Sequence, residues 1–189
     1  NGVRGGSATV HFPIWHKEIE DIIVLKNNKG TEDNRVRKLD YSIQLSKLFY
    51  ERFINDEDIT LFSPHEVPEL YEAWGTDEFD GLYETAERKT SVSKKKVSAQ
   101  SLFFDMLKER AETGRIYIMN IDHSNSHSSF LDKVNMSNLC QEITLPTDPI
   151  QHIDGDGEIA LCILSAVNVG IIKEEEFEDI CDLAVRGLD

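Results

Sequence analysis

The sequence predicts an α/β protein built on a mostly parallel sheet or barrel, and two patterns predict it. Short β-prone runs alternate along the chain with stretches whose apolar residues recur at helical spacing. Such alternation is typical of strand–helix–strand units with parallel strands. In addition, the run IALCIL at residues 159–164 is continuously apolar, as strands buried on both faces of a parallel sheet are.

The first half of the chain divides into elements at polar and proline-containing positions. The β-prone run before Pro13 and the helical spacing that follows are the clearest signals. In order, we expect a strand at 8–12, a helix at 16–26, a loop at 27–34, a strand leading into a helix at 41–53, a strand at 59–62 closed by Ser63-Pro64, and short surface helices at 69–74 and 79–88.

The second half begins with the basic cluster Lys94-Lys95-Lys96, which we interpret as a solvated turn. A helix at 99–112 should end at Gly114, because glycine adopts the left-handed conformation that ends helices. The remaining expected elements are a β-prone run at 116–121, a polar loop rich in Ser, His and Asn, a β-prone stretch after Cys140 ending at Pro146, a strand at 159–164 and a final amphipathic helix.

Composition excludes several classes of protein. The chain has 189 residues and a net charge of −15, which argues against nonspecific nucleic-acid binding because that requires a basic surface. No apolar run reaches the roughly 20 residues of a membrane helix, and the N-terminus has no secretory signal. Three cysteines are too few and too widely spaced for a disulfide scaffold. We therefore expect a cytoplasmic protein.

Both ends suggest a longer protein. Asn1 is not an initiator residue, and the chain stops within an amphipathic helix. Natural domain boundaries usually fall in polar linkers. We expect residues 1–189 to be a partial domain, truncated at both ends.

The most informative motif is the SNLCQE segment, residues 137–142. If it is extended, Asn138, Cys140 and Glu142 face one side, because side chains alternate along a strand. An amide can orient a sugar hydroxyl, a carboxylate can accept its proton, and a thiol can act as a nucleophile or a radical. Taken alone, the same residues could form a loop with an incidental buried cysteine.

Longer blocks carry a resemblance to a known family. MSNLCQEITLPT and the later GEIALCILSAVNVG resemble the finger loop and following barrel strand of class I ribonucleoside-diphosphate reductase large subunits. NGVRGG, ATVHFPIWH, IVLKNNKG, NRVRKLDYSIQ, DITLFSPHEVPELYEA and ERAETGRIYIMNIDH match in the same order. The resemblance covers essentially the whole chain. It implies part of a ten-stranded α/β barrel, with residues 137–142 as the central finger loop.

The resemblance implies a role for each residue of the motif. Cys140 would become the thiyl radical that abstracts the 3′-hydrogen of a ribonucleotide. Glu142 would be the base for the 3′-hydroxyl, and Asn138 would hold the sugar hydroxyls. Cys162 would be one half of the dithiol that supplies the reducing electrons, although a cysteine in an apolar strand is otherwise a common core residue.

Residues 1–6 would be the end of the specificity loop, which transmits the effector's identity to the substrate site. Arg4 would face the ligand, while Gly2, Gly5 and Gly6 permit close approach of a nucleotide. The alternative is a surface turn.

Three other features have a structural interpretation. We expect no metal at Asp122, His123 and His127, because two histidines four apart meet only on a helix and this Ser/Asn-rich sequence indicates a loop. Ser124 replaces a non-catalytic cysteine of many family members. Cys181 is interpreted as a core residue, and Trp15 and Trp74 as packing residues.

The implied activity needs several partners. A metal-containing small subunit would supply the radical, thioredoxin or glutaredoxin the electrons, and nucleoside triphosphates the allosteric control. The parent subunit would be a homodimer. One alternative is a non-catalytic fragment, or a split-subunit piece active only on assembly. Adenosylcobalamin-dependent and glycyl-radical reductases are a second alternative, but Glu142 and the surrounding blocks favour the two-subunit class.

Overall fold

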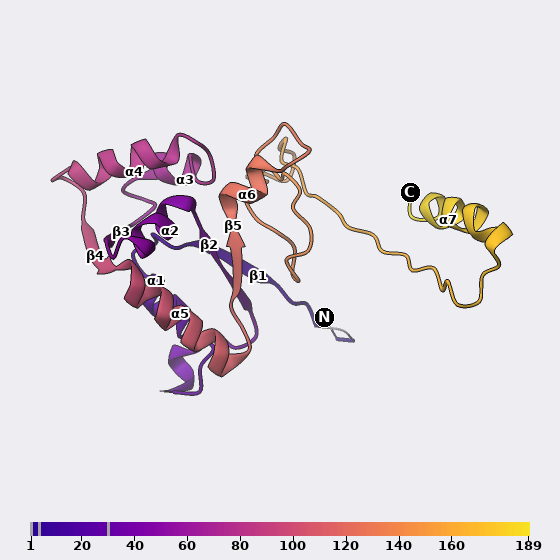
Figure 1. The fold of residues 1–189 in the computed structure, drawn as a ribbon, viewed down its shortest axis with the longest axis horizontal. Coiled ribbons are helices and arrows are strands. Elements are labelled where there is room, and N and C mark those ends of the chain that lie inside the picture. The colour runs from indigo at the N-terminus through magenta and orange to yellow at the C-terminus, as the bar shows by residue number, and fades with distance from the viewer. Residues whose placement is uncertain (1, 4, 30) are drawn as a thin grey trace. The chain divides into compact units, whose positions relative to one another are not determined.

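The computed structural model describes residues 2–3, 5–29 and 31–189. It divides into two units, Asn1–Thr147 and Asp148–Asp189. The first unit holds both sheets and the buried core, and the second holds a short 3-10 helix and one α-helix (Figure 1).

A three-stranded parallel sheet organises the first unit. Its strands are β1 (Thr9–Pro13), β2 (Asp40–Leu45) and β5 (Tyr117–Asn120), in the order β1-β2-β5. His11 pairs with Ser42, and Ser42 pairs with Tyr117. These bounds confirm the predicted strands at 8–12 and 116–121 and the strand that leads into a helix at 41–53, and the parallel order confirms the predicted topology.

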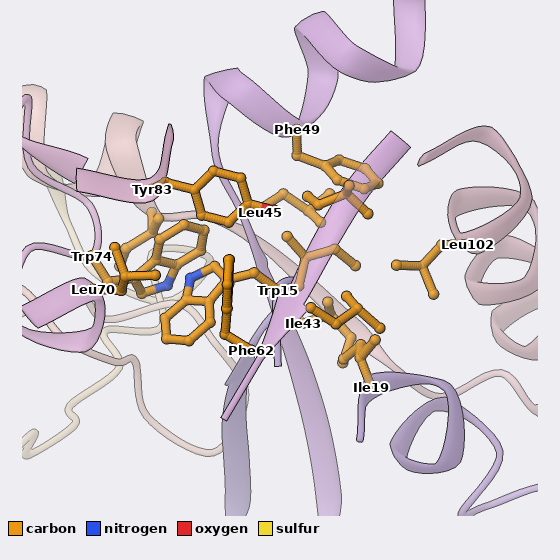
Figure 2. Close-up of a cluster of buried hydrophobic side chains, with 14 of the residues drawn as sticks. Trp15, Ile19, Ile43, Leu45, Phe49, Phe62, Leu70, Trp74, Tyr83 and Leu102 are labelled. Carbon is orange, nitrogen blue, oxygen red and sulfur yellow. The ribbon is translucent and has the colours of Figure 1, made fainter. Parts of the chain in front are cut away.

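The two faces of this sheet differ in chemistry. Tyr41, Ile43 and Leu45 alternate along β2 with Ser42 and Gln44, so they point to opposite faces. The apolar face packs against α1 (Ile19–Ile23), α2 (Lys47–Ile54) and α5 (Ala99–Thr113). Figure 2 shows Ile43 beside Ile19 of α1, and Leu45 near Phe49 of α2.

An antiparallel pair of strands lies next to α3 (Pro68–Glu72) and α4 (Phe79–Arg88). Strand β3 (Asp58–Phe62) pairs with β4 (Lys94–Ser98), so the predicted solvated turn at Lys94–Lys96 is wrong. The lysine backbones pair with β3 while Lys95 and Lys96 stay exposed, as charged residues on edge strands do.

Aromatic residues fill the space between these elements and the sheet. Trp15 is fully buried, and its ring centroid lies 5.9 Å from that of Trp74. Phe79 lies 4.5 Å from Trp74, in an edge-to-face arrangement that aromatic pairs prefer. The predicted packing roles of both tryptophans are confirmed. Helices α3 and α4 bury Leu70, Phe79, Tyr83 and Ala86, so they belong to the core as well as the surface.

Local signals set the ends of several helices. Ser98 caps α5 by accepting a hydrogen bond from the Ser101 N–H, and Gly114 ends that helix with a left-handed φ of 64°, as predicted. Helix α1 is shorter than the predicted 16–26 because turns flank it on both sides. The short 3-10 helix η1 (Glu32–Asn34) lies in the predicted loop at 27–34.

The second unit contains η2 (Glu174–Glu176) and α7 (Phe177–Arg186), which confirms the final helix. The predicted strand at 159–164 is wrong, since Ile159 to Leu164 form no strand and Leu161 is 77% exposed. The β-prone stretch from Cys140 to Pro146 is not a strand either. Strands persist by pairing, and among the described residues of this unit we find only an isolated bridge between Asp148 and Glu158. No helix in the described part of the chain has the length and apolar character to cross a bilayer.

Candidate active-site loop

The SNLCQE segment lies on the polar face of the parallel sheet. Thr9 Oγ1 donates a hydrogen bond of 2.7 Å to the carbonyl oxygen of Leu139. His11 Nε2 lies 3.1 Å from the carbonyl oxygen of Ser137, which can only accept, so this nitrogen carries the proton. Strand β1 therefore holds the segment by its backbone.

Strand β2 also contacts the segment, as well as the chain just before it. Ser42 Oγ donates to Gln141 Oε1 at 2.8 Å, and Gln44 Nε2 donates to the carbonyl oxygen of Asn135 at 2.8 Å. Gln44 Oε1 also accepts from Trp74 Nε1 at 2.8 Å, so the aromatic core orients this glutamine. Buried polar groups need such partners, and here they are used to hold the segment.

The segment is a turn, which corrects the expected extended row. The Gln141 N–H donates to the Asn138 carbonyl oxygen at 3.1 Å, so Leu139 and Cys140 form the centre of a β-turn. Gln141 then has a left-handed φ of 63°. Asn138, Cys140 and Glu142 consequently do not alternate along a strand. The side chain of Gln141 was expected only to face away from these three residues. Instead it is hydrogen-bonded to the sheet, at the point where the turn ends.

Cys140 and Glu142 differ from Asn138 in their exposure to solvent. Cys140 and Glu142 are exposed, and Asn138 is partly buried. Asn138 Oδ1 accepts hydrogen bonds from the Ile143 N–H at 3.0 Å and from Ser137 Oγ at 3.2 Å. The side-chain amide oxygen is therefore occupied within the segment, and the amide nitrogen is the atom that could donate to a sugar hydroxyl.

The chain just before the SNLCQE segment is hydrogen-bonded to α6 (Ile121–Ser126). Asn125 accepts a hydrogen bond from the Val134 N–H and donates one to the Val134 carbonyl oxygen, at 2.8 and 3.1 Å. Gly75 packs against the same helix with a φ of 81°, and a Cβ there would lie 2.6 Å from Ile121 Cγ1 and 2.8 Å from Asn125 Nδ2. Only a residue without a side chain fits this contact.

The predicted loop around His123 is also wrong, because these residues form α6. Ile121 is fully buried, and the Asp122 carboxylate accepts a hydrogen bond from the Lys47 N–H at the start of α2. Burial raises the pKa of Asp122, partly offset by that hydrogen bond. The rings of His123 and His127 come within 5.6 Å. Within the described residues, however, no three potential metal ligands of the His, Cys, Asp and Glu types gather in one place.

A hollow of about 350 Å³ opens beside the turn. Its polar lining comes from the end of β5, from α6 and from the loop: Asn120, His123, Ser124, His127, Gln141 and Thr144. Ile118 and Met119 of β5 complete the lining, so Gln141 brings the turn to the edge of this hollow.

The other predicted site residues lie elsewhere. Cys162 belongs to the second unit and is exposed, so the predicted orientation into a barrel interior is not seen. Cys181 on α7 is half-buried, and α7 buries none of its residues, so its interpretation as a core residue is wrong. Gly2, Gly5 and Gly6 are exposed, and a Cβ at any of them would meet no atom within 4 Å. Arg4 lies outside the described residues.

Comparison with known proteins decides the family. The family model described as the ribonucleotide reductase barrel domain matches residues 1–189. The chain belongs to the ribonucleotide reductase barrel domain family. Among similar proteins are the ribonucleoside-diphosphate reductase alpha subunits of Haemophilus influenzae, 55% identical, of Buchnera aphidicola subsp. Schizaphis graminum, 52% identical, and of Enterobacteria phage T4, 43% identical. Each match covers 100% of this chain but 26% of the relative, so the chain spans about a quarter of their length.

Family membership confirms the resemblance and the class of fold, an α/β structure that forms part of a barrel domain. Reductase-type sequence motifs pointed to Cys140, Asn138 and Glu142, but sequence reasoning missed the residues that support them. The supporting residues Thr9, His11, Ser42 and Gln44 alternate with other side chains along β1 and β2. That alternation could have revealed a polar face opposite the core.

Proposed function

We propose that this chain provides the radical-bearing loop of a ribonucleoside-diphosphate reductase large subunit, which converts ribonucleoside diphosphates to 2′-deoxyribonucleoside diphosphates. The observation that carries the proposal is the SNLCQE turn, which presents an exposed Cys140 two residues from Glu142 in a chain of this family. A thiol that starts chemistry on a sugar must be reachable by that sugar.

Each side chain has a defined task in this reaction. The Cys140 thiyl takes the 3′-hydrogen and becomes a thiol again, leaving a carbon radical on the ribose. Glu142 accepts the proton of the 3′-hydroxyl, the 2′-hydroxyl takes a proton from the reducing thiol pair and leaves as water, and Asn138 donates a hydrogen bond that holds the sugar. Cys162 and a second thiol supply two electrons and form a disulfide, and Cys140 regains its radical when the 3′-hydrogen returns.

The remaining parts of the proposal concern partners. A separate metal-containing small subunit generates the radical, and thioredoxin or glutaredoxin reduces the disulfide again. Nucleoside triphosphates act as effectors through the specificity loop at residues 1–6, with Arg4 facing the ligand and Gly2, Gly5 and Gly6 allowing its approach. We place the enzyme in the cytoplasm, with the large subunit as a homodimer.

The test compares two cysteines in the complete large subunit, assayed with small subunit, effector and dithiol. Cys140→Ser should abolish deoxynucleotide formation and leave substrate binding intact, because serine cannot form the radical at a comparable cost. Cys181→Ser, at a half-buried position of α7, is the matched control and should retain turnover. Turnover by the Cys140→Ser variant would contradict the proposal.

A second candidate is a piece that works only after assembly with complementary chains. The exposed apolar side chains of Leu161, Ile163 and Leu164 favour it, because such surfaces usually become covered. We expect the 189-residue chain alone to be inactive, since catalysis needs groups held to within fractions of an ångström. Deoxynucleotide formation after mixing the chain with complementary segments would support assembly.

A further inference from the structure

Gln141, the residue after Cys140, is bound to the sheet through both atoms of its amide. Its Nε2 donates to the carbonyl oxygen of Ile118 in β5 at 2.7 Å, and its Oε1 accepts from Ser42 Oγ in β2 at 2.8 Å. Ser42 has no exposed surface and Gln141 is partly buried, so this contact is partly shielded from water. The amide therefore bridges two neighbouring strands of the parallel sheet.

The backbone of Gln141 is held as well. Its N–H closes the β-turn onto Asn138, and its φ of 63° lies in the left-handed region, which residues other than glycine rarely adopt. A residue keeps such a conformation when its surroundings determine it. Here the side-chain bridge and the hydrogen bond of the turn together fix the backbone conformation of Gln141.

Cys140 lies between the two ends of this arrangement. Asn138 closes the turn before it, and Gln141 anchors the turn after it. The direction of the Cys140 side chain is therefore coupled to the amide bridge. The other sheet contacts, from Thr9 and His11, go to backbone carbonyl oxygens, so the bridge adds a side-chain anchor within the segment itself.

We infer that Gln141 is a positioning residue for Cys140, and that the Ser42–Gln141–Ile118 bridge fixes the turn that presents the thiol. This inference rests on the proposed function of Cys140. Hydrogen abstraction depends steeply on the distance and angle between sulfur and the 3′-carbon, and misplacement by about 1 Å can cost about a hundredfold in rate. Loss of the bridge should therefore affect the chemical step more than substrate binding.

The experiment uses the complete large subunit with its small subunit, effector and dithiol. Gln141→Ala should lower kcat by about tenfold or more while KM for the substrate stays within about twofold. Gln141→Met fills nearly the same space without the hydrogen bonds, and it should show a similar loss in kcat. This second variant separates loss of the bridge from loss of packing.

The matched control is Gln100→Ala. Gln100 on α5 also donates from Nε2 to a backbone carbonyl oxygen, that of Phe53, at 3.1 Å, and this bond lies outside the SNLCQE segment. Its kcat and KM should equal those of the wild type. Equal losses of kcat in the Gln100 and Gln141 variants would overturn the inference, because the effect would then be one of general stability.

A coupling measurement tests the bridge itself. Ser42→Ala removes one end, so Ser42→Ala combined with Gln141→Ala should lower kcat no further than Gln141→Ala alone. Full additivity would overturn the bridge. So would a wild-type kcat in both Gln141→Ala and Gln141→Met, provided that Cys140→Ser is inactive. Turnover by Cys140→Ser would instead overturn the proposed function, so the two failures are distinguishable.

Discussion

The two units of the chain differ in whether their β-prone apolar runs are buried in strands. In the first unit, Leu61 of β3 lies in a paired strand and has no exposed surface. In the second unit, Leu161 lies in a continuously apolar run, forms no strand and is 77% exposed. The difference shows that an apolar pattern specifies a buried strand only where neighbouring strands and helices are available to cover it.

The largest expected effect is on stability, from truncating the two leucines. Leu61→Ala should lower the free energy of unfolding by about 2–5 kcal/mol, because it leaves a cavity in the core. Leu161→Ala should change it by less than about 0.5 kcal/mol, since an exposed side chain loses little contact on truncation. Urea unfolding followed by the fluorescence of Trp15 and Trp74, together with circular dichroism for the whole chain, measures both. A large cost at Leu161 would mean that its run is packed.

A second prediction contrasts a partly buried and an exposed ion pair of the first unit. Arg52 donates two hydrogen bonds of 2.7 Å to the Glu87 carboxylate, which also accepts one from Thr60. Glu87→Gln should therefore cost about 1.5–3 kcal/mol in the free energy of unfolding, measured by urea unfolding. Glu69→Gln, which breaks the exposed pair with Lys89, should cost less than about 1 kcal/mol.

The pH dependence of the Glu87 effect has a defined sign. Burial alone would raise the pKa of Glu87, but the hydrogen bonds from Arg52 and Thr60 outweigh it and lower this pKa below its usual 4.5. The stabilisation is therefore fully present above pH 4.5 and is lost as the pH falls through the folded-state pKa. Urea midpoints of wild type and Glu87→Gln should converge in acid, and a constant difference would contradict this assignment.

His11 offers a smaller test at the polar face of the sheet. Burial lowers its pKa below 6.5 and outweighs the hydrogen bond to Ser137, which raises it. The unfolded chain then binds a proton that the folded chain does not, so this contribution to stability is present above pH 6.5 and is lost as the pH falls below it. Titration of the His11 ring by NMR should give a value below 6.5. The loss of stability should disappear in His11→Gln, and a normal titration would place the ring in solvent.

The smallest effect concerns thiol reactivity in the two units. Cys140 and Cys162 are exposed and should react with a thiol reagent at similar rates, whereas the half-buried Cys181 should react a few-fold more slowly. Single Cys→Ser variants show which cysteine gives each kinetic phase of the reaction with the reagent. Protection of Cys162 but not Cys140 would show that the apolar run of the second unit is covered, which would remove the contrast between the units.

Local signals predicted most of the first unit. The helix at 79–88 has its predicted bounds, and Gly114 ends α5 because its left-handed backbone is a local property. The strand β4 and the helix α6 were missed because tertiary contacts override their composition. The Lys94–Lys96 backbones pair with β3, and α6 forms where Ile121 is buried and Asp122 accepts from Lys47.

For the candidate site, the sequence predicted the residues but not their geometry. Cys140, Asn138 and Glu142 were identified from the motif and the family resemblance. Their arrangement in a turn depends on Ser42 and Ile118, which are distant in sequence, and no local pattern encodes that contact. Likewise, the roles of Cys162 and Arg4 stay predictions.

The glycine at position 75 has a consequence for the reactive end of the molecule. Any side chain there would collide with Ile121 and Asn125, and Asn125 is the residue that grips the backbone of Val134. A substitution at Gly75 would thus displace α6, and with it the backbone at Val134 that leads into the cysteine-bearing segment. Damage to the thiol's placement can begin at a position that never approaches the thiol.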